Sequence, residues 1–176
     1  MIRNHGPRLA VLTLLGAALC ALPVRAATKS SLSASDRHFL NAAIMGSMAE
    51  VQLGHLALQK AAGNDVRQFA QEMINDHSRA SGKFVRTAGR KGVVPPTTVG
   101  ADALKTYKRL SALEGAAFDR AYMQAMLEDH QKDVAEFKNA SRSVRDRDLH
   151  ALVVATLPVL QSHLEMARKM MQSANP

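Results

Sequence analysis

The sequence contains one cysteine, Cys20, and no tryptophan, and aromatic residues make up only 4% of it. A single cysteine excludes an internal disulfide framework and the structural zinc sites that need several thiolates. Scarce aromatic residues beside abundant Ala, Leu and Met favour helices over strands. The 176 residues are 47% apolar, which is enough for one domain with its own core.

The chain also lacks an apolar run of the roughly 20 residues that a membrane-spanning helix needs. The apolar run over residues 9–22 is shorter; it follows Arg3 and Arg8 and precedes the small-residue signature Val24-Arg25-Ala26. This order is typical of a secretory signal peptide. We therefore predict a signal peptide over residues 1–26 and export to the periplasm of a Gram-negative cell, as a soluble or peripherally associated protein.

Cleavage after Ala26 or Ala27 would leave no cysteine in the mature protein and would lower the formal net charge from +8 to +5, because three arginines leave with the signal. Attachment of a lipid at Cys20 is the alternative, but Leu19 is a poor residue directly before a lipidated cysteine. An exported protein with few aromatic side chains also fits nucleic acid poorly, so we expect no nucleic-acid partner.

Four apolar stripes with steps of three and four residues predict four long helices. They lie in one domain over residues 35–173, after a mobile polar leader at residues 27–34. The stripes are Leu40, Ile44, Met48, Val51, His55, Leu58 and Ala62; Val66, Phe69, Met73, His77, Ala80 and Phe84; Met123, Met126, His130, Val134 and Phe137; and Leu149, Val153, Thr156, Leu160, His163, Ala167 and Met170.

Capping and linker signals separate these stripes. Asn64 is a predicted cap for the second helix and Asp146 for the fourth. A proline pair interrupts the longest linker, and residues 101–110 after it form a predicted short helix. Ser111, with a glutamate three residues on, predicts a capping box that starts the third long helix. The sequence thus predicts an all-α fold, an up-down four-helix bundle with a short extra helix in the linker between helices two and three.

Each stripe carries one histidine: His55, His77, His130 or His163. A helix rises about 1.5 Å per residue, so depths can be compared from the end where the first two helices join, if the main helices alternate in direction. Glu50 and His77 then lie roughly 18 Å deep and His130 roughly 16 Å. His163 comes at roughly 24 Å and His55 at roughly 10 Å. Glu50, His77 and His130 therefore share a predicted layer, with His163 close by and His55 a turn or more away.

Inward histidines beside an acid are typical of a transition-metal site, for Fe, Cu or Zn. The predicted ligands are Glu50, His77, His130 and His163. Asp76 and Asp129 each directly precede a stripe histidine and are predicted outer-shell partners. The alternative is that each histidine donates to a buried carboxylate or carbonyl and helps to fix the register of the bundle.

Methionines and basic residues form two further patterns. The stripe methionines are Met48, Met73, Met123 and Met126. Thioethers suit Cu(I), but methionine more often fills gaps in a core. One face of the second helix carries Arg79, Lys83, Arg86 and Arg90. This face could meet an anionic envelope surface, although a solvated face is the commoner outcome.

A set of motifs resembles a known family. The motifs are Glu50, Met73-x-x-Asp76-His77, Phe118-Asp119-x-x-Tyr122, His130 and Leu157-Pro158-x-Leu160-x-x-His163-Leu164. Together they resemble a large bacterial family of exported proteins, catalogued as domain of unknown function 4142 and often labelled predicted outer-membrane proteins. The resemblance covers about residues 36–172 and implies a ferritin-like four-helix bundle without an established activity.

The chain departs from the ferritin-like di-iron proteins, which carry Glu-x-x-His on two helices. The residue three before His77 is Ile74, and the residue three before His163 is Leu160. A histidine-rich site for a single ion therefore fits better than a di-iron centre.

An enzyme is the class with the least support, because the sequence has no phosphate-binding loop, no dinucleotide fingerprint, no His-Glu-x-x-His motif and no nucleophile elbow. We predict an exported bundle that binds a transition metal for storage, sensing or stress protection. The alternative is a non-catalytic cell-envelope structural or interaction protein, with structural core histidines and a basic membrane-facing surface.

Overall fold

The structure is a computed structural model of the chain, and it describes residue 1 and residues 32–173. The described part contains five helices and no strand. The helices are α1 (Ala34–Lys60), α2 (Asn64–Arg90), α3 (Ala101–Ser111), α4 (Gly115–Ser143) and α5 (Arg147–Ser173). The predicted signal peptide and most of the predicted leader lie outside the described residues. Between residues 32 and 173, the helices are too short or too polar to cross a membrane.

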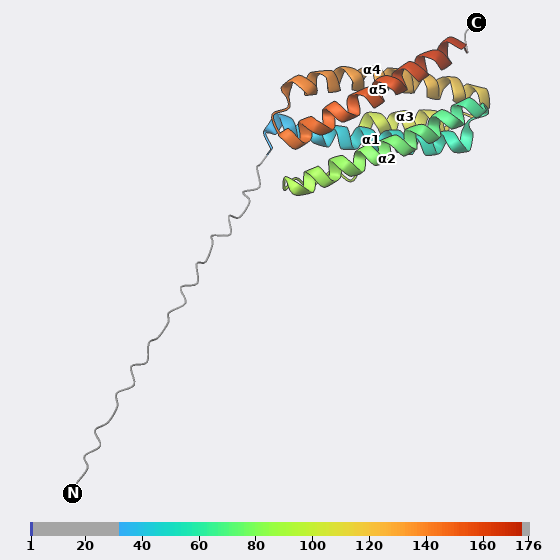
Figure 1. The fold of residues 1–176 in the computed structure, drawn as a ribbon. Helices are drawn as coiled ribbons and strands as arrows, with labels where there is room; N and C mark the ends of the chain where they lie inside the picture. The colour runs from blue at the N-terminus through green and yellow to red at the C-terminus, as the bar shows by residue number, and fades with distance from the viewer. Residues whose placement is uncertain (2–31, 174–176) are drawn as a thin grey trace.

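The four long helices pack side by side as a bundle, and α3 lies along it (Figure 1). α1 packs mainly against α2, and α4 mainly against α5, each pair being joined by a short turn. The two pairs meet where α2 contacts α5 and α1 contacts α4. The predicted all-α class, the bundle architecture and the extra helix in the linker are confirmed.

The helix α3 takes the chain back along the bundle, so that α4 begins at the end where α1 and α2 join (Figure 1). Asp119, near the start of α4, accepts hydrogen bonds from the backbone N–H groups of Ala62 (3.1 Å) and Gly63 (2.8 Å) in the α1–α2 turn. α4 therefore runs in the same direction as α2. The depths predicted for His130 and His163 assumed main helices of alternating direction, and that assumption is wrong.

One predicted cap is confirmed and two are wrong. Asp146 accepts hydrogen bonds from the N–H groups of Asp148 (3.1 Å) and Leu149 (3.0 Å) at the start of α5. Asn64 is instead the first residue of α2, which has no side-chain cap. Ser111 is the last residue of α3, and α4 starts at Gly115, whose φ of +59° is a conformation that L residues rarely adopt.

The helices α1 and α2 lie close together at Gly54. A Cβ atom there would lie 2.7 Å from Cγ1 of Ile74 and 3.1 Å from the carbonyl oxygen of Ala70. Gly46 lies two turns earlier on α1, and a Cβ atom there would meet nothing within 4 Å. The same substitution at these two sites therefore has opposite expected effects.

We expect Gly46→Ala to raise the free energy of unfolding by about 0.5–1 kcal/mol, because alanine favours a helix over glycine. We expect Gly54→Ala to lower it by about 1–3 kcal/mol, because the added methyl group pushes two packed helices apart. Urea unfolding of both variants measures the difference. Equal stabilisation by the two substitutions would contradict the close approach at Gly54.

The core consists of two apolar clusters with a polar layer between them. The cluster towards the α1–α2 turn includes Phe69, Phe118 and Tyr122. The cluster towards the opposite end includes Phe84 and Phe137. On each long helix, one polar residue falls between members of the two clusters and is at most 3% exposed: Glu50, His77, His130 and His163. The polar layer is therefore enclosed by apolar side chains on both sides.

Candidate metal site

Each of the four long helices contributes one side chain to the polar layer. Glu50 comes from α1, His77 from α2, His130 from α4 and His163 from α5. The three imidazole rings form a nearly regular triangle, with centroids 5.6 Å apart for His77 and His130 and 5.3 Å apart for the other two pairs. The structure thus brings together all four residues that the sequence placed in or near one layer.

His55 does not belong to this layer, because its side chain is exposed on α1. The stripe assigned to the first helix is therefore wrong at this position. Five residues along a helix correspond to a rotation of roughly 140°, so Glu50 and His55 cannot both face the core. The buried face of α1 instead carries Ile44, Ser47 and Glu50.

Glu50 lies between two of the rings without a regular hydrogen bond. Its Oε2 is 2.5 Å from Nδ1 of His77, and its Oε1 is 3.4 Å from Nε2 of His130. Neither contact has hydrogen-bonding geometry, and Nε2 of His77 also has no hydrogen-bond partner among the described residues. Buried polar atoms are nearly always paired, so three unpaired atoms in one layer point to a ligand.

Burial opposes charge on every member of the polar layer. Burial raises the pKa of Glu50 to about 8; His130 opposes this shift and Asp129 adds to it. Burial lowers the pKa of His77 to about 4. Burial, followed by the electrostatic effect of His77, lowers the pKa of His163 to about 4. Burial also lowers the pKa of His130. Neutral imidazole is the form that binds metal ions, so the environment keeps the rings ready as ligands.

A hydrogen bond defines the tautomer of His130, whereas His163 has a contact at each ring nitrogen. Nδ1 of His130 lies 2.9 Å from the carbonyl oxygen of Met126, which can only accept, so Nδ1 carries the proton and Nε2 a lone pair. Nε2 of His163 lies 3.2 Å from Oδ2 of Asp76, and a carboxylate in this position is a common partner of a metal-binding histidine. When that proton is on Nε2, Nδ1 of His163 carries a lone pair that faces Nε2 of His130 at 3.3 Å. The two lone pairs repel unless a cation lies between them.

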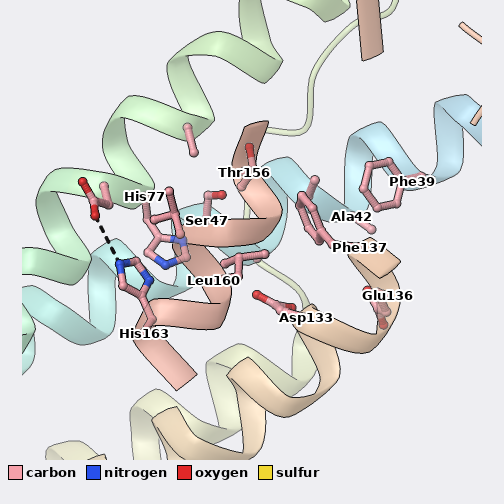
Figure 2. Close-up of a pocket in the computed structure, with 15 residues that line it drawn as sticks. Phe39, Ala42, Ser47, His77, Asp133, Glu136, Phe137, Thr156, Leu160 and His163 are labelled. Carbon is pink, nitrogen blue, oxygen red and sulfur yellow. Dashed lines mark hydrogen bonds and ion pairs between the residues drawn. The ribbon is translucent and has the colours of Figure 1, made fainter. Parts of the chain in front are cut away.

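The donor atoms fit a small metal ion. Two nitrogens that lie about 2.0–2.1 Å from a tetrahedral ion are about 3.3–3.4 Å apart, and the His130–His163 separation is 3.3 Å. One ring nitrogen from each of the three histidines lies within 4.8 Å of the others. A cavity of about 30 Å³ reaches His77 and His163 (Figure 2). It can hold one ion or a water molecule, but it has no room for an organic substrate.

The two predicted outer-shell residues lie in different surroundings. Asp76 is half-buried and bridges Nε2 of His163 and the guanidinium of Arg79, which is 2.9 Å away. Asp129 is also half-buried, and burial raises its pKa. No hydrogen bond from Asp129 to the polar layer is present in the described part of the chain, and Asp129 acts on Glu50 through its charge. Asp76 therefore has the geometry of an outer-shell partner, whereas Asp129 does not.

Sequence reasoning missed three residues near the layer. Asp133 lines the cavity, and burial raises its pKa well above the usual range. Tyr122 has a buried hydroxyl group without a hydrogen-bond partner. Glu72 forms a second donor group with Asp76 and His163. For Glu72, the sequence did carry a signal: Glu72 and Asp76 are four residues apart on one helix and therefore share a face.

The fold recurs in solved structures of low sequence identity. A DUF305 fragment from Deinococcus radiodurans aligns with a TM-score of 0.72 and 14% identity, over 81% of this chain and 99% of that one. CopM in its Cu(I)-bound form aligns with a TM-score of 0.69 and 17% identity, over 80% of this chain and 98% of that one. A DUF305 protein from Streptomyces coelicolor, described as secreted by prediction, aligns with a TM-score of 0.69 and 15% identity, over 79% and 91% of the two chains. These likenesses show the fold alone.

Among curated proteins, none matches the chain significantly in sequence. A family model described as a domain of unknown function, DUF4142, matches residues 21–170. This match agrees with the resemblance that the motifs around Glu50, His77, His130 and His163 carry. The chain therefore belongs to the DUF4142 family.

Proposed function

We propose that this protein binds one transition-metal ion, with copper as the preferred ion, in the layer formed by Glu50, His77, His130 and His163. The observation that carries the proposal is the convergence of three histidine nitrogens within 4.8 Å of one another, beside buried polar atoms that lack hydrogen bonds. Both oxygens of Glu50 and Nε2 of His77 lack hydrogen bonds, and the facing nitrogens of His130 and His163 are 3.3 Å apart. A cation held by the three histidine nitrogens, which lie within 4.8 Å of one another, would supply a partner that the described side chains do not supply.

The donor set supports copper. Imidazole suits Cu, Zn, Fe and Ni, and among divalent first-row ions Cu(II) binds nitrogen and oxygen ligands most tightly. Structures of CopM, which has the same fold, are described in Cu(I)-, Ag- and Cu(II)-bound forms. A cavity of about 30 Å³ leaves no room for an organic substrate beside the ion, which favours storage, delivery or sensing over catalysis. The predicted signal sequence supports a role outside the cytoplasm.

The envelope-protein alternative has less support. Arg79, Lys83, Arg86 and Arg90 are exposed on α2, as a basic docking face requires, but a solvated face has the same appearance. Histidines that serve only to fix the register would be expected to have partners for both ring nitrogens. His77 does not meet this condition, since its Nε2 has no hydrogen-bond partner.

Metal loading tests the proposal directly. After chelator treatment, loading with Cu²⁺ and desalting, we expect the wild-type protein to retain one copper ion per chain. The His77→Ala/His130→Ala variant should retain less than a tenth of this amount, because it loses two of three imidazole ligands. His55→Ala is the matched control, since His55 is exposed, and it should bind like the wild type. Equal copper content in the wild type and the double variant, measured by mass spectrometry, would overturn the proposal.

A further inference from the structure

A second donor group lies between the polar layer and the surface. Glu72, Asp76 and His163 each offer one ligand atom, and these atoms lie within 4.8 Å of one another. Glu72 is exposed, Asp76 is half-buried and His163 is buried, so the group leads from solvent to the inner rings. Glu72 and Asp76 are four residues apart on α2 and therefore share one helix face.

His163 belongs to both groups through different nitrogens. Its Nε2 faces Oδ2 of Asp76 at 3.2 Å, and its Nδ1 faces Nε2 of His130 at 3.3 Å. A neutral imidazole carries one proton and so offers one lone pair. With the proton on Nε2, the lone pair is on Nδ1 and faces His130 in the inner layer. With the proton on Nδ1, the ring donates to His130, and its lone pair turns towards Asp76 and Glu72.

The cavity connects the two groups. Asp76, His77 and His163 line it together, and the dashed line in Figure 2 marks the contact between His163 and Asp76. Arg79 pairs with Oδ1 of Asp76, which leaves Oδ2 on the side of His163. An ion held by the outer group is therefore next to the space that leads to His77.

We propose that Glu72, Asp76 and Nε2 of His163 form an entrance station, which captures a divalent cation from solvent and passes it to the inner layer. This inference rests on the proposed function, because the station serves the inner layer. During capture, the cation takes the place of the Nε2 proton while the ring keeps its single proton on Nδ1. On inward transfer, the single proton of the ring is again on Nε2, so the proton count of the ring is unchanged and no electron moves. One ring serves one group at a time, so the protein holds one ion rather than two.

Loading kinetics test the station. We expect Glu72→Gln to slow the bimolecular uptake of Cu²⁺ about tenfold at low ionic strength, because an exposed carboxylate that attracts the cation is lost. Stopped-flow quenching of tyrosine fluorescence measures the rate, and the retained copper per chain should not change. The matched control is Glu165→Gln, which removes the same charge from an exposed position on α5 where the carboxylate pairs with Lys169. Uptake by Glu72→Gln at the wild-type rate would overturn the station.

A second measurement separates the two proposals. In the His77→Ala/His130→Ala background, Cu²⁺ should still bind weakly, be lost on desalting, and show one nitrogen ligand by electron paramagnetic resonance. Adding Glu72→Gln should weaken this binding at least tenfold. If the wild type retains no copper while the double variant shows this weak site, the proposed function is wrong. If the wild type retains copper while the double variant lacks the weak site, only the entrance-station proposal is wrong.

Discussion

Replacing Glu50 and His77 together with leucine is expected to raise the free energy of unfolding of the metal-free protein by about 1–4 kcal/mol and to abolish copper binding. The two side chains are buried 2.5 Å apart and leave three polar atoms without hydrogen bonds. Burying such atoms costs free energy, whereas leucine fills a similar space with apolar atoms. Urea unfolding of chelator-treated protein measures the effect on stability.

A structural role for the Glu50–His77 pair predicts the opposite result. If the pair fixes the register of the bundle, the double variant should unfold more easily than the wild type. The single substitution Glu50→Leu is the control, and it should be less stable than the double variant, because it leaves His77 buried without its nearest polar contact. Higher stability together with lost binding would identify residues that are retained for function.

The stability advantage of the leucine pair is expected to be constant from about pH 4.5 to 6.5 and then to grow by about 1.4 kcal/mol per pH unit up to about pH 8. In the unfolded chain, the glutamate titrates near its ordinary pKa of 4.5 and the histidine near 6.5. In the fold, the pKa of Glu50 is about 8 and that of His77 about 4. The folded pair therefore holds one proton across the whole range from pH 4 to 8.

The sign follows from counting protons in the two states. Between pH 4.5 and 6.5 the unfolded pair also holds one proton, so the stability contribution of the pair does not depend on pH. Above pH 6.5 the unfolded pair has lost its proton while the folded pair keeps one on Glu50, so wild-type stability falls as pH rises. Unfolding both proteins at pH 5, 6, 7 and 8 measures the difference, and groups common to both largely cancel. A stability difference that does not change above pH 6.5 would mean that the folded pair holds no proton there and that Glu50 is ionised in the fold.

The pattern of α2 could be predicted well because its large apolar residues lie on one face. Val66, Phe69, Met73, His77 and Phe84 are all buried, as their spacing predicts. The pattern of α1 was harder to predict because small residues form much of its buried face. Ala43, Ser47 and Gly54 are buried, but a search for large apolar side chains passes over them and includes exposed His55 instead.

The sequence by itself determined the helical class, the number of helices and the inward direction of the three histidines of the polar layer. Periodicity points His77, His130 and His163 inward, because each lies on the apolar stripe of its helix. Glu50 was placed beside them by its depth, since the stripe assigned to the first helix carried His55 instead. Only the tertiary structure decided that α4 starts at the α1–α2 end, which ring nitrogens face each other, and that Glu72 joins Asp76 and His163. The physical reason is that distances between helices depend on chain direction and on the rotation of each helix about its axis. Long-range packing sets both, and the spacing of residues along one helix carries no information about either.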